Sequence, residues 1–443
     1  MLKDLHKSVS SEGAMVRMAD ASYPAPFRSG IEYSAPARGA WNIVHTGMLL
    51  PEAHQIFVCA AGCLRGVVLT AAEMNAQDRF STIAVREENV LKGDMEDLIL
   101  KGVADILDRL PKRPPAVLLY TSCIHHFIGC DLDLVYDRLR ERFPDVDFTD
   151  CYMNPIMRKS GLTPDQLMRR QLYNLIRPGQ PKDPKKVNII GNNPRIAADG
   201  DLVRMLRGAG WTVQDIYDMS TYEAYQTMGT AAWNISWNPA AKPAGDMLEQ
   251  KLGQQHLYLL DSYGYEEIRT AIDEAACRCG VAALDHEAEI ASCEKAIAQA
   301  KETVGTTTVW IDYTATNRPL SLARLLLTHG FHVDTVFLDS VSGVEKDDFD
   351  WLKEHAPDLK LMATVHPKMR LLPREQKEKI LAIGQKAAYF ADTPYFVNIV
   401  EDDGQYGYAG IRAMMGQMIE SLENEKDTRA LIQIKGLGCG VCV

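Results

Sequence analysis

Residues 116–140, AVLLYTSCIHHFIGCDLDLVYDRLR, are the stretch that decides the fold. Residues 116–120 form a short apolar run, which is typical of a buried parallel strand. Cys123 follows at the carboxyl end of this strand, where open α/β sheets place their chemistry. Residues 131–140 then form an amphipathic helix whose first turn is acidic, as the positive end of a helix favours. The pattern predicts a strand–turn–helix unit that presents Cys123 on the turn.

A cysteine on such a turn is placed to bind a metal cluster. The alternative is a buried structural thiol, because free cysteine is among the most buried residue types. Residues 55–66, QIFVCAAGCLRG, repeat the pattern with Cys59 and Cys63. Glycine and alanine around a thiolate leave room for a bulky group and let backbone N–H groups approach sulfide. The two stretches together favour a metal cluster.

These stretches resemble the component 1 subunits of nitrogenase and nitrogenase-like reductases, a family that includes tetrapyrrole reductases and cofactor-assembly scaffolds. Residues 58–63 are similar to its His-Gly-Pro-x-Gly-Cys turn, and residues 88–94 to its Glu-x-x-x-x-Gly-Gly segment. Residues 122–131 are similar to its Ser-x-Cys-x4-Ile-Gly-x-Asp loop, with the order before the cysteine compressed. The resemblance implies that Cys63 and Cys123 hold an iron–sulfur cluster of the 4Fe–4S or 8Fe–7S (P-cluster) type, shared with a partner subunit.

One family ligand is missing from its usual place. The family carries a first cluster cysteine just after an N-terminal arm, but the matching residues 38–41, RGAW, contain none. Cys59 lies where the family commonly has the glycine of its His-Gly-Pro turn. We expect Cys59 to restore the third thiolate, and the alternative is a core thiol beside the real ligands.

The ligands of an active-site cofactor are also missing. In catalytic α-type subunits a cysteine and a histidine hold that cofactor. The matching residues 233–238, WNISWN, offer only Ser236 or Trp237, and residues 405–410, QYGYAG, offer Tyr406. The chain therefore resembles a β-type subunit or an assembly scaffold more than an α-type subunit, and we expect it to hold no active-site cofactor of its own.

The remaining cysteines and one histidine are weaker candidates. Cys151 and His366 are the candidates for a compensating ligand, against a packing thiol and a structural histidine as alternatives. One long helical stretch, residues 268–303, carries three cysteines that we interpret as packing thiols, because C-x-C on a helix does not point both sulfurs one way; they are Cys277, Cys279 and Cys293. A C-x-x-C pair alone is a weak metal signal, so we expect an unliganded, Gly-rich tail around Cys439 and Cys442.

Composition narrows the class of protein. The chain has 443 residues, 46% of them hydrophobic, which is enough for several cores. It has no run of eighteen apolar residues and no signal-peptide-like start, so we expect a cytoplasmic protein that enters no membrane. Ten cysteines without a secretion signal favour thiols and metal sites over disulfides. The net charge of −11 argues against nucleic-acid binding.

Strand–Gly-turn–helix units recur near residues 116, 187 and 306, separated first by a linker at residues 177–186. With the family resemblance, they predict an α/β fold of three doubly wound, Rossmann-like domains around a shared cleft. The expected segments are an arm at 1–38, domains at 39–180, 187–303 and 304–435, and a flexible tail at 436–443.

The resemblance implies a subunit of a nitrogenase-like reductase that relays electrons. The expected partners are a paralogous α-type subunit, in a complex of two α-type and two β-type subunits, and an ATP-dependent iron–sulfur reductase. Among relatives, a methylthio-alkane reductase β-subunit fits the short length and the missing cofactor ligands, and it would serve reductive C–S bond cleavage. The alternatives are a cofactor-assembly scaffold, a tetrapyrrole reductase subunit, and a binding protein that uses no cluster.

Overall fold

The computed structural model describes residues 13–33, 35, 37, 41–153, 161–371 and 378–432. Contacts divide the chain into two compact units. We call one the cysteine unit; it comprises Trp41–Arg195 and Leu206–Leu259. The other, the carboxyl-terminal unit, is drawn from Met1–Ala40, Ile196–Met205 and Leu260–Val443. The expected α/β fold with parallel sheets is confirmed, whereas the domain boundaries expected from the sequence stay a prediction.

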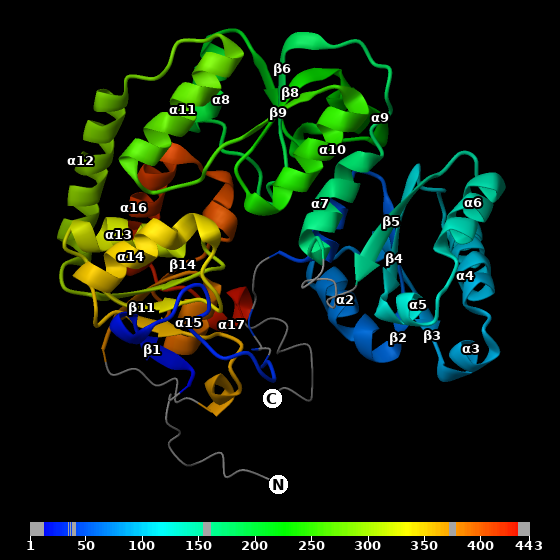
Figure 1. Cartoon of the computed structure of the whole chain (residues 1–443), viewed down its shortest axis with the longest axis horizontal. Helices are drawn as coiled ribbons and strands as arrows, with labels where there is room; N and C mark the ends of the chain where they lie inside the picture. The colour runs from blue at the N-terminus through cyan, green and yellow to red at the C-terminus, as the bar shows by residue number, and fades with distance from the viewer. Residues whose placement is uncertain are drawn as a thin grey trace. The chain divides into compact units, whose positions relative to one another are not determined.

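The first sheet of the cysteine unit is a four-stranded parallel sheet with helices on both faces (Figure 1). Its strands, in spatial order, are β3 (Phe80–Val85), β2 (His54–Ala60), β4 (Ala116–Ser122) and β5 (Asp147–Met153). One face packs against α4 (Met95–Arg109) and α6 (Leu132–Arg142). The other packs against α1 (Ile43–Met48), α2 (Ala61–Glu73) and α7 (Pro164–Asn174). All seven residues of β4 are buried, which explains its unbroken apolar run.

Two aromatic rings fix the centre of this sheet. Phe57 on β2 and Tyr120 on β4 are paired in register, and their rings stack with centroids 3.9 Å apart at 6°. The Tyr120 hydroxyl donates a hydrogen bond to the carbonyl of Ile43 in α1, over 3.1 Å. A Cβ on Gly47 would lie 2.4 Å from that hydroxyl, so only glycine lets α1 approach the sheet. Stacked aromatic pairs contribute about 1 kcal/mol beyond their buried area.

A second parallel sheet of the cysteine unit shares a hydrophobic core with the first. Its order is β7 (Thr212–Gln214), β6 (Asp183–Ile189), β8 (Ala231–Ser236) and β9 (Gln255–Tyr258). The helices α9 (Tyr222–Gln226) and α10 (Lys242–Leu252) belong to this part of the chain. β6 begins inside the segment that the sequence indicated as a linker, because Asp183 already pairs with Ala231 before the register shifts at Val187.

The carboxyl-terminal unit contains a six-stranded sheet with one antiparallel edge. Its order is β1 (Met15–Arg17), β12 (Lys360–Met362), β11 (His332–Phe337), β10 (Thr308–Asp312), β13 (Ile380–Ile383) and β14 (Phe396–Val397). β1 pairs antiparallel with β12, with Val16 opposite Leu361, so the described part of the N-terminal arm packs on its own unit. The helices of this unit are α11 (Tyr265–Cys279), α12 (His286–Val304), α13 (Pro319–Thr328), α14 (Lys346–His355), α15 (Gln385–Ala391), α16 (Gly407–Glu423) and α17 (Thr428–Leu431).

The sequence predicted one helical stretch over residues 268–303, and the structure breaks it into α11 and α12. Gly280 ends α11 in the left-handed conformation, at φ +64°. Asp285 then begins α12 by accepting a hydrogen bond from the N–H of Ala288, over 3.1 Å. Two short helices of the cysteine unit are α3 (Glu87–Lys92) and α5 (Cys123–Phe127). The helix α8 (Asp201–Gly208) has its first residues in the carboxyl-terminal unit and its last residues in the cysteine unit. Among the residues described, none of the helices has both the length and the apolar character needed to cross a membrane.

Candidate functional site

Three neighbouring strands bring together the three segments that resemble the family. β3, β2 and β4 lie side by side, and Val58 is opposite both Ile83 and Thr121. Residues 58–63, 88–94 and 122–131 lie at or beyond the carboxyl ends of these strands. Because parallel strands end at the same edge of a sheet, the segments share one edge, which we call the cysteine edge (Figure 1).

Cys63 is the accessible thiol of this edge. It is the third residue of α2 and is exposed. The residue before α2 is Ala60, whose side chain cannot cap the helix, so the first N–H groups of α2 have no side-chain acceptor. The space beside Gly62 is open, since a Cβ there would meet no atom within 4 Å. A positive helix end with open space beside it suits an anionic sulfide cluster.

Cys123 is the first residue of α5, and its side chain is half-buried. The sequence predicted a loop here, but a short helix begins at once after β4. His125 sets this helix start, because its Nδ1 accepts a hydrogen bond from the N–H of Ser122 over 3.2 Å. Cys123 is thereby presented at the cysteine edge by the strand adjacent to the one that leads to Cys63.

Cys59 lies behind the other two cysteines, in the core of the sheet. It is the penultimate residue of β2, and only 1% of it is exposed. Burial raises the pKa of its thiol to about 12, and the charges of Cys63 and Cys123 add to the shift. Cys63 follows Cys59 by four positions, and Cys123 comes directly after the adjacent strand β4. The structure therefore brings the three predicted ligands together, with two of them accessible and one enclosed.

The donors of the cysteine edge are mainly thiols. Across the described ranges, no group of three or more His, Cys, Asp or Glu side chains is arranged to hold one metal ion. A cluster differs from a single ion because its thiolates bind different iron atoms and stand farther apart. Thiolates are the ligands that iron–sulfur clusters take. Accessible soft donors beside an open helix end fit an iron–sulfur cluster.

Sequence reasoning missed two residues beside this site. His125 is 1% exposed, and its Nε2 has no hydrogen-bond partner among the residues described. Burial lowers its pKa, against the opposing effects of the Ser122 backbone and the charge of Glu96. The Cys130 thiol is half-buried next to Glu96, and burial raises its pKa to about 12. The Ser-x-x-His spacing at 122–125, which resembles a capping box, was the signal available in the sequence.

Large apolar side chains stand exposed on the elements that begin at the cysteine edge. Leu91 on α3 is 81% exposed, and Phe127 on α5 is 65% exposed. The others of this set are Val68 on α2, Ile128 after α5, and Leu134 on α6. Exposed apolar side chains of this size occur in interaction surfaces when they form a contiguous patch.

The weaker candidates separate into buried and exposed groups. Cys151 is 1% exposed and belongs to the same core as Cys59, and its packing role stays a prediction. His366 is partly buried, and its Nδ1 accepts a hydrogen bond from the N–H of Lys368 over 3.2 Å. Cys279 and Cys293 are buried as expected. The packing interpretation is wrong for Cys277, because this position of α11 faces solvent. Residues 38–40 and the pair Cys439 and Cys442 lie outside the described residues.

The positions that replace cofactor ligands are engaged in structural contacts. Ser236 Oγ is hydrogen-bonded to His256 Nε2 over 2.9 Å, and Trp237 is buried. The Tyr406 hydroxyl donates a hydrogen bond to the carbonyl of Leu260 over 3.1 Å. None of these three side chains supplies a soft donor.

Comparison with known proteins shows what the chain is similar to. The family of nitrogenase component 1 type oxidoreductases matches residues 44–423. The solved structure described as "Nitrogenase Cp1 at pH 6.5" has a TM-score of 0.62 and 14% identity, over 89% of this chain and 94% of that chain. "Nitrogenase Cp1 at pH 5" has a TM-score of 0.58 and 13% identity, over 94% and 96%. No curated protein matches the sequence. At these identities the two structures show a shared fold, and the family match covers most of the chain. The chain therefore belongs to the nitrogenase component 1 type oxidoreductases.

Proposed function

We propose that this chain is an electron-relaying subunit of a nitrogenase-like oxidoreductase and shares an iron–sulfur cluster with a partner subunit. The observation that supports it best is the pair of accessible thiols, Cys63 and Cys123, on adjacent strand ends. Exposed apolar side chains on the same elements suit the subunit interface that a shared cluster needs.

Cys63 and Cys123 are the principal ligands in this proposal, and Cys59 is the third. Iron must displace the proton that burial holds on Cys59, and a coordinated thiol is deprotonated outright. The cluster, of the 4Fe–4S or 8Fe–7S type, supplies one-electron transfer when bound. The chain contributes the thiolates, the free N–H groups at the start of α2, and an apolar surround that excludes water.

The active site belongs to a partner in this proposal. The partner is a paralogous α-type subunit in a complex of two α-type and two β-type subunits. Electrons come from an ATP-dependent iron–sulfur reductase, and the whole system is cytoplasmic. The engaged side chains of Ser236, Trp237 and Tyr406 support this division, because they leave no soft ligand at the positions that match an α-type site.

The proposed reaction is reductive cleavage of a C–S bond in a methylthio-alkane. Two electrons and two protons convert R–S–CH3 into R–H and CH3–SH. The carbon–sulfur bond breaks, one proton joins carbon, and the other joins sulfur. The reductase supplies both electrons, and the solvent supplies both protons.

Iron content tests the cluster assignment. The chain is purified without oxygen together with its α-type partner, as wild type and as Cys63→Ala, Cys123→Ala and Cys277→Ala. We expect the first two variants to lose most of the iron and the thiolate-to-iron absorption. Cys277→Ala removes a thiol of the other unit that is exposed like Cys63, and it should keep both the iron and the absorption. Wild-type iron in both edge variants would overturn the proposal.

Turnover tests the reaction. The complex is supplied with reductase, ATP and dimethyl sulfide, and methane and methanethiol are measured. Product formation that is lost in Cys123→Ala supports the reaction. Cluster transfer to an acceptor protein without turnover would instead identify an assembly scaffold. A spectral shift on adding a tetrapyrrole would identify a tetrapyrrole reductase.

A further inference from the structure

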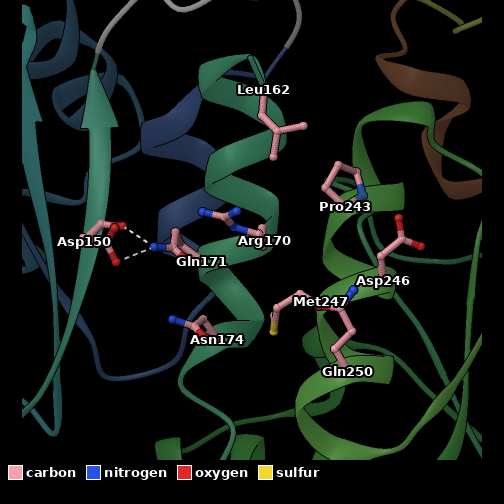
Figure 2. A pocket seen from close by; sticks show the side chains of 9 residues that line it. All are labelled: Asp150, Leu162, Arg170, Gln171, Asn174, Pro243, Asp246, Met247 and Gln250. Atoms are coloured by element: carbon pink, nitrogen blue, oxygen red, sulfur yellow. Dashed lines mark hydrogen bonds between the residues drawn. The ribbon is translucent and has the colours of Figure 1, made fainter.

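A cavity of about 480 Å³ lies in the cysteine unit, between α7 and α10. Figure 2 shows Arg170 and Asn174 on α7, Asp246 and Met247 on α10, and Asp150 on β5 around it. Small-molecule sites typically enclose about 300–1,000 Å³ and combine an apolar lining with a few polar groups. This cavity has a volume in that range and a lining that combines apolar and polar side chains.

Arg170 is the group that points to a ligand. Its side chain is half-buried, and no hydrogen bond or ion pair joins its guanidinium to any residue that the structure describes. The next residue, Arg169, shows the contrast: it is 1% exposed, bonded to Asp165 over 3.3 Å and also donating to the carbonyl of Gly191. A guanidinium carries five donors and costs free energy when it is partly desolvated without an acceptor.

The two acids of the cavity have partners of their own. Asp150 accepts hydrogen bonds from the hydroxyl of Tyr152 and from Nε2 of Gln171, each over 2.5 Å. Asp246 lies 3.3 Å from Nδ1 of His256, and its side chain is 52% exposed. Both donors to Asp150 are neutral, so Asp150 keeps its negative charge, and the charge of Arg170 acts on this pair by opposing the raised pKa of Tyr152. Asp246 keeps an open carboxylate face at the mouth of the cavity.

These charges select the chemistry of the ligand. A guanidinium binds a carboxylate in a bidentate manner. One arginine and two aspartates line the cavity, so it disfavours a phosphate dianion more than a ligand whose positive and negative charges balance. Asp246 instead suits a positively charged amine. Leu162, Pro243 and Met247 provide the apolar wall.

We propose that this cavity binds a zwitterionic α-amino acid with an apolar side chain. Arg170 holds its carboxylate, Asp246 holds its ammonium group, and the side chain lies against Leu162, Pro243 and Met247. The side-chain amide of Asn174 adds a donor through Nδ2, because its Oδ1 already accepts a hydrogen bond from Nζ of Lys251 over 3.3 Å. This site is independent of the cluster, so its test does not depend on the proposed function.

Calorimetry on the full-length chain tests the site with three probes of matched shape. L-Leucine has both charges, 4-methylpentanoate lacks the amine, and isoamylamine lacks the carboxylate. We expect L-leucine to bind, and both analogues to bind at least about tenfold more weakly. Arg170→Gln and Asp246→Asn should each lower the affinity for L-leucine by a similar factor. Arg138→Gln removes an exposed arginine from α6 and should leave binding unchanged.

Three results would overturn the proposal. The first is no binding of any probe at millimolar concentration. The second is wild-type affinity for L-leucine in Arg170→Gln. The third is equal affinity for L-leucine and 4-methylpentanoate, which would remove the role of Asp246. Thermal melting of each variant shows whether it is folded. Arg170→Lys keeps the positive charge but loses the bidentate hydrogen bonding of the guanidinium, so it should bind L-leucine with intermediate affinity.

Discussion

The carboxylate of Asp312 accepts a hydrogen bond from the backbone N–H of Ala387 over 2.6 Å. Asp312 ends β10, and Ala387 lies in the first turn of α15, which follows the adjacent strand β13. The N–H of Thr314 donates to the same carboxylate, also over 2.6 Å. Burial raises the pKa of Asp312, and these bonds oppose that rise. One buried carboxylate thus ties two strand ends together where the strand order reverses.

Gly384, which precedes α15, cannot be replaced by a residue with a side chain without disturbing the Asp312 carboxylate. It has φ +107°, and a Cβ there would lie 2.5 Å from Oδ2 of Asp312. We expect Gly384→Ala to lower the free energy of unfolding by about 2 kcal/mol or more, from backbone strain and the clash. Urea denaturation measures the change. Gly343→Ala is the control, since a Cβ there meets no atom within 4 Å, and equal midpoints for both variants would contradict the argument.

His54 gives the cysteine unit a defined acid sensitivity. Burial, helped by the charge of Arg79, lowers its pKa from 6.5 to about 4. The unfolded chain therefore binds more protons than the folded chain between these pH values. The contribution of His54 to the free energy of unfolding is therefore present above pH 6.5 and is lost as the pH falls from 6.5 towards 4. This loss amounts to about 2 kcal/mol between pH 7 and pH 5.

Replacing this side chain tests the sign. His54 Nε2 is hydrogen-bonded to the Ser81 hydroxyl over 2.8 Å, and glutamine keeps a polar group there without titrating. Unfolding by urea at pH 7 and pH 5 should show a smaller pH dependence for His54→Gln than for wild type. His332→Gln, at an exposed histidine, should match wild type. An unchanged slope in His54→Gln would refute the assignment.

Cys59 is the ligand with the most distinctive prediction. If it is the third thiolate, Cys59→Ala should alter the EPR signal of the reduced cluster or lower the iron content. Cys151→Ala is the matched control, because Cys151 is an equally buried thiol of the same core. An identical signal in both variants would return Cys59 to the role of a packing residue.

The apolar surround of the cysteine edge predicts a partner surface. Leu91→Asp and Phe127→Asp place a charge on side chains that are 81% and 65% exposed. We expect both to weaken association with the α-type subunit at least about tenfold, with little effect on folding. Sedimentation of mixed subunits measures it. Val344→Asp alters an exposed apolar residue of the other unit and should not weaken association.

We expect this chain to hold no active-site cofactor of its own. The positions that match α-type ligands hold Ser236, Trp237 and Tyr406, which bind soft iron–sulfide poorly. Cys151, which is buried in the core, and His366, which is partly buried, are the candidates for a compensating ligand. An anomalous iron map of the whole complex decides the matter. Iron bound by this chain away from the cysteine edge would refute the prediction.

Local sequence patterns predicted much of the fold. The apolar run at 116–120 and the acids before α6 are local signals, and the structure confirms both: β4 is buried, and Asp131 caps α6 by accepting the N–H of Leu134 over 3.0 Å. Residues far apart in sequence were harder. Nothing local predicts that Met15 pairs with Met362, or that Arg170 and Asp246 line one cavity. Burial of Cys59 also depends on helices that pack from elsewhere in the chain.

The pairing of β1 with β12 has a consequence for biosynthesis. Every residue of the cysteine unit has been synthesised by position 259, before the first parallel strand of the other sheet leaves the ribosome. β1 is synthesised first, but it can pair only after β12, which lies more than three hundred positions downstream, has been synthesised. Such a distant contact is slow to form and leaves an apolar strand edge open meanwhile. Nascent chains should therefore gain protease resistance in the cysteine unit first, and chaperone dependence should concentrate on the edge that β1 finally covers.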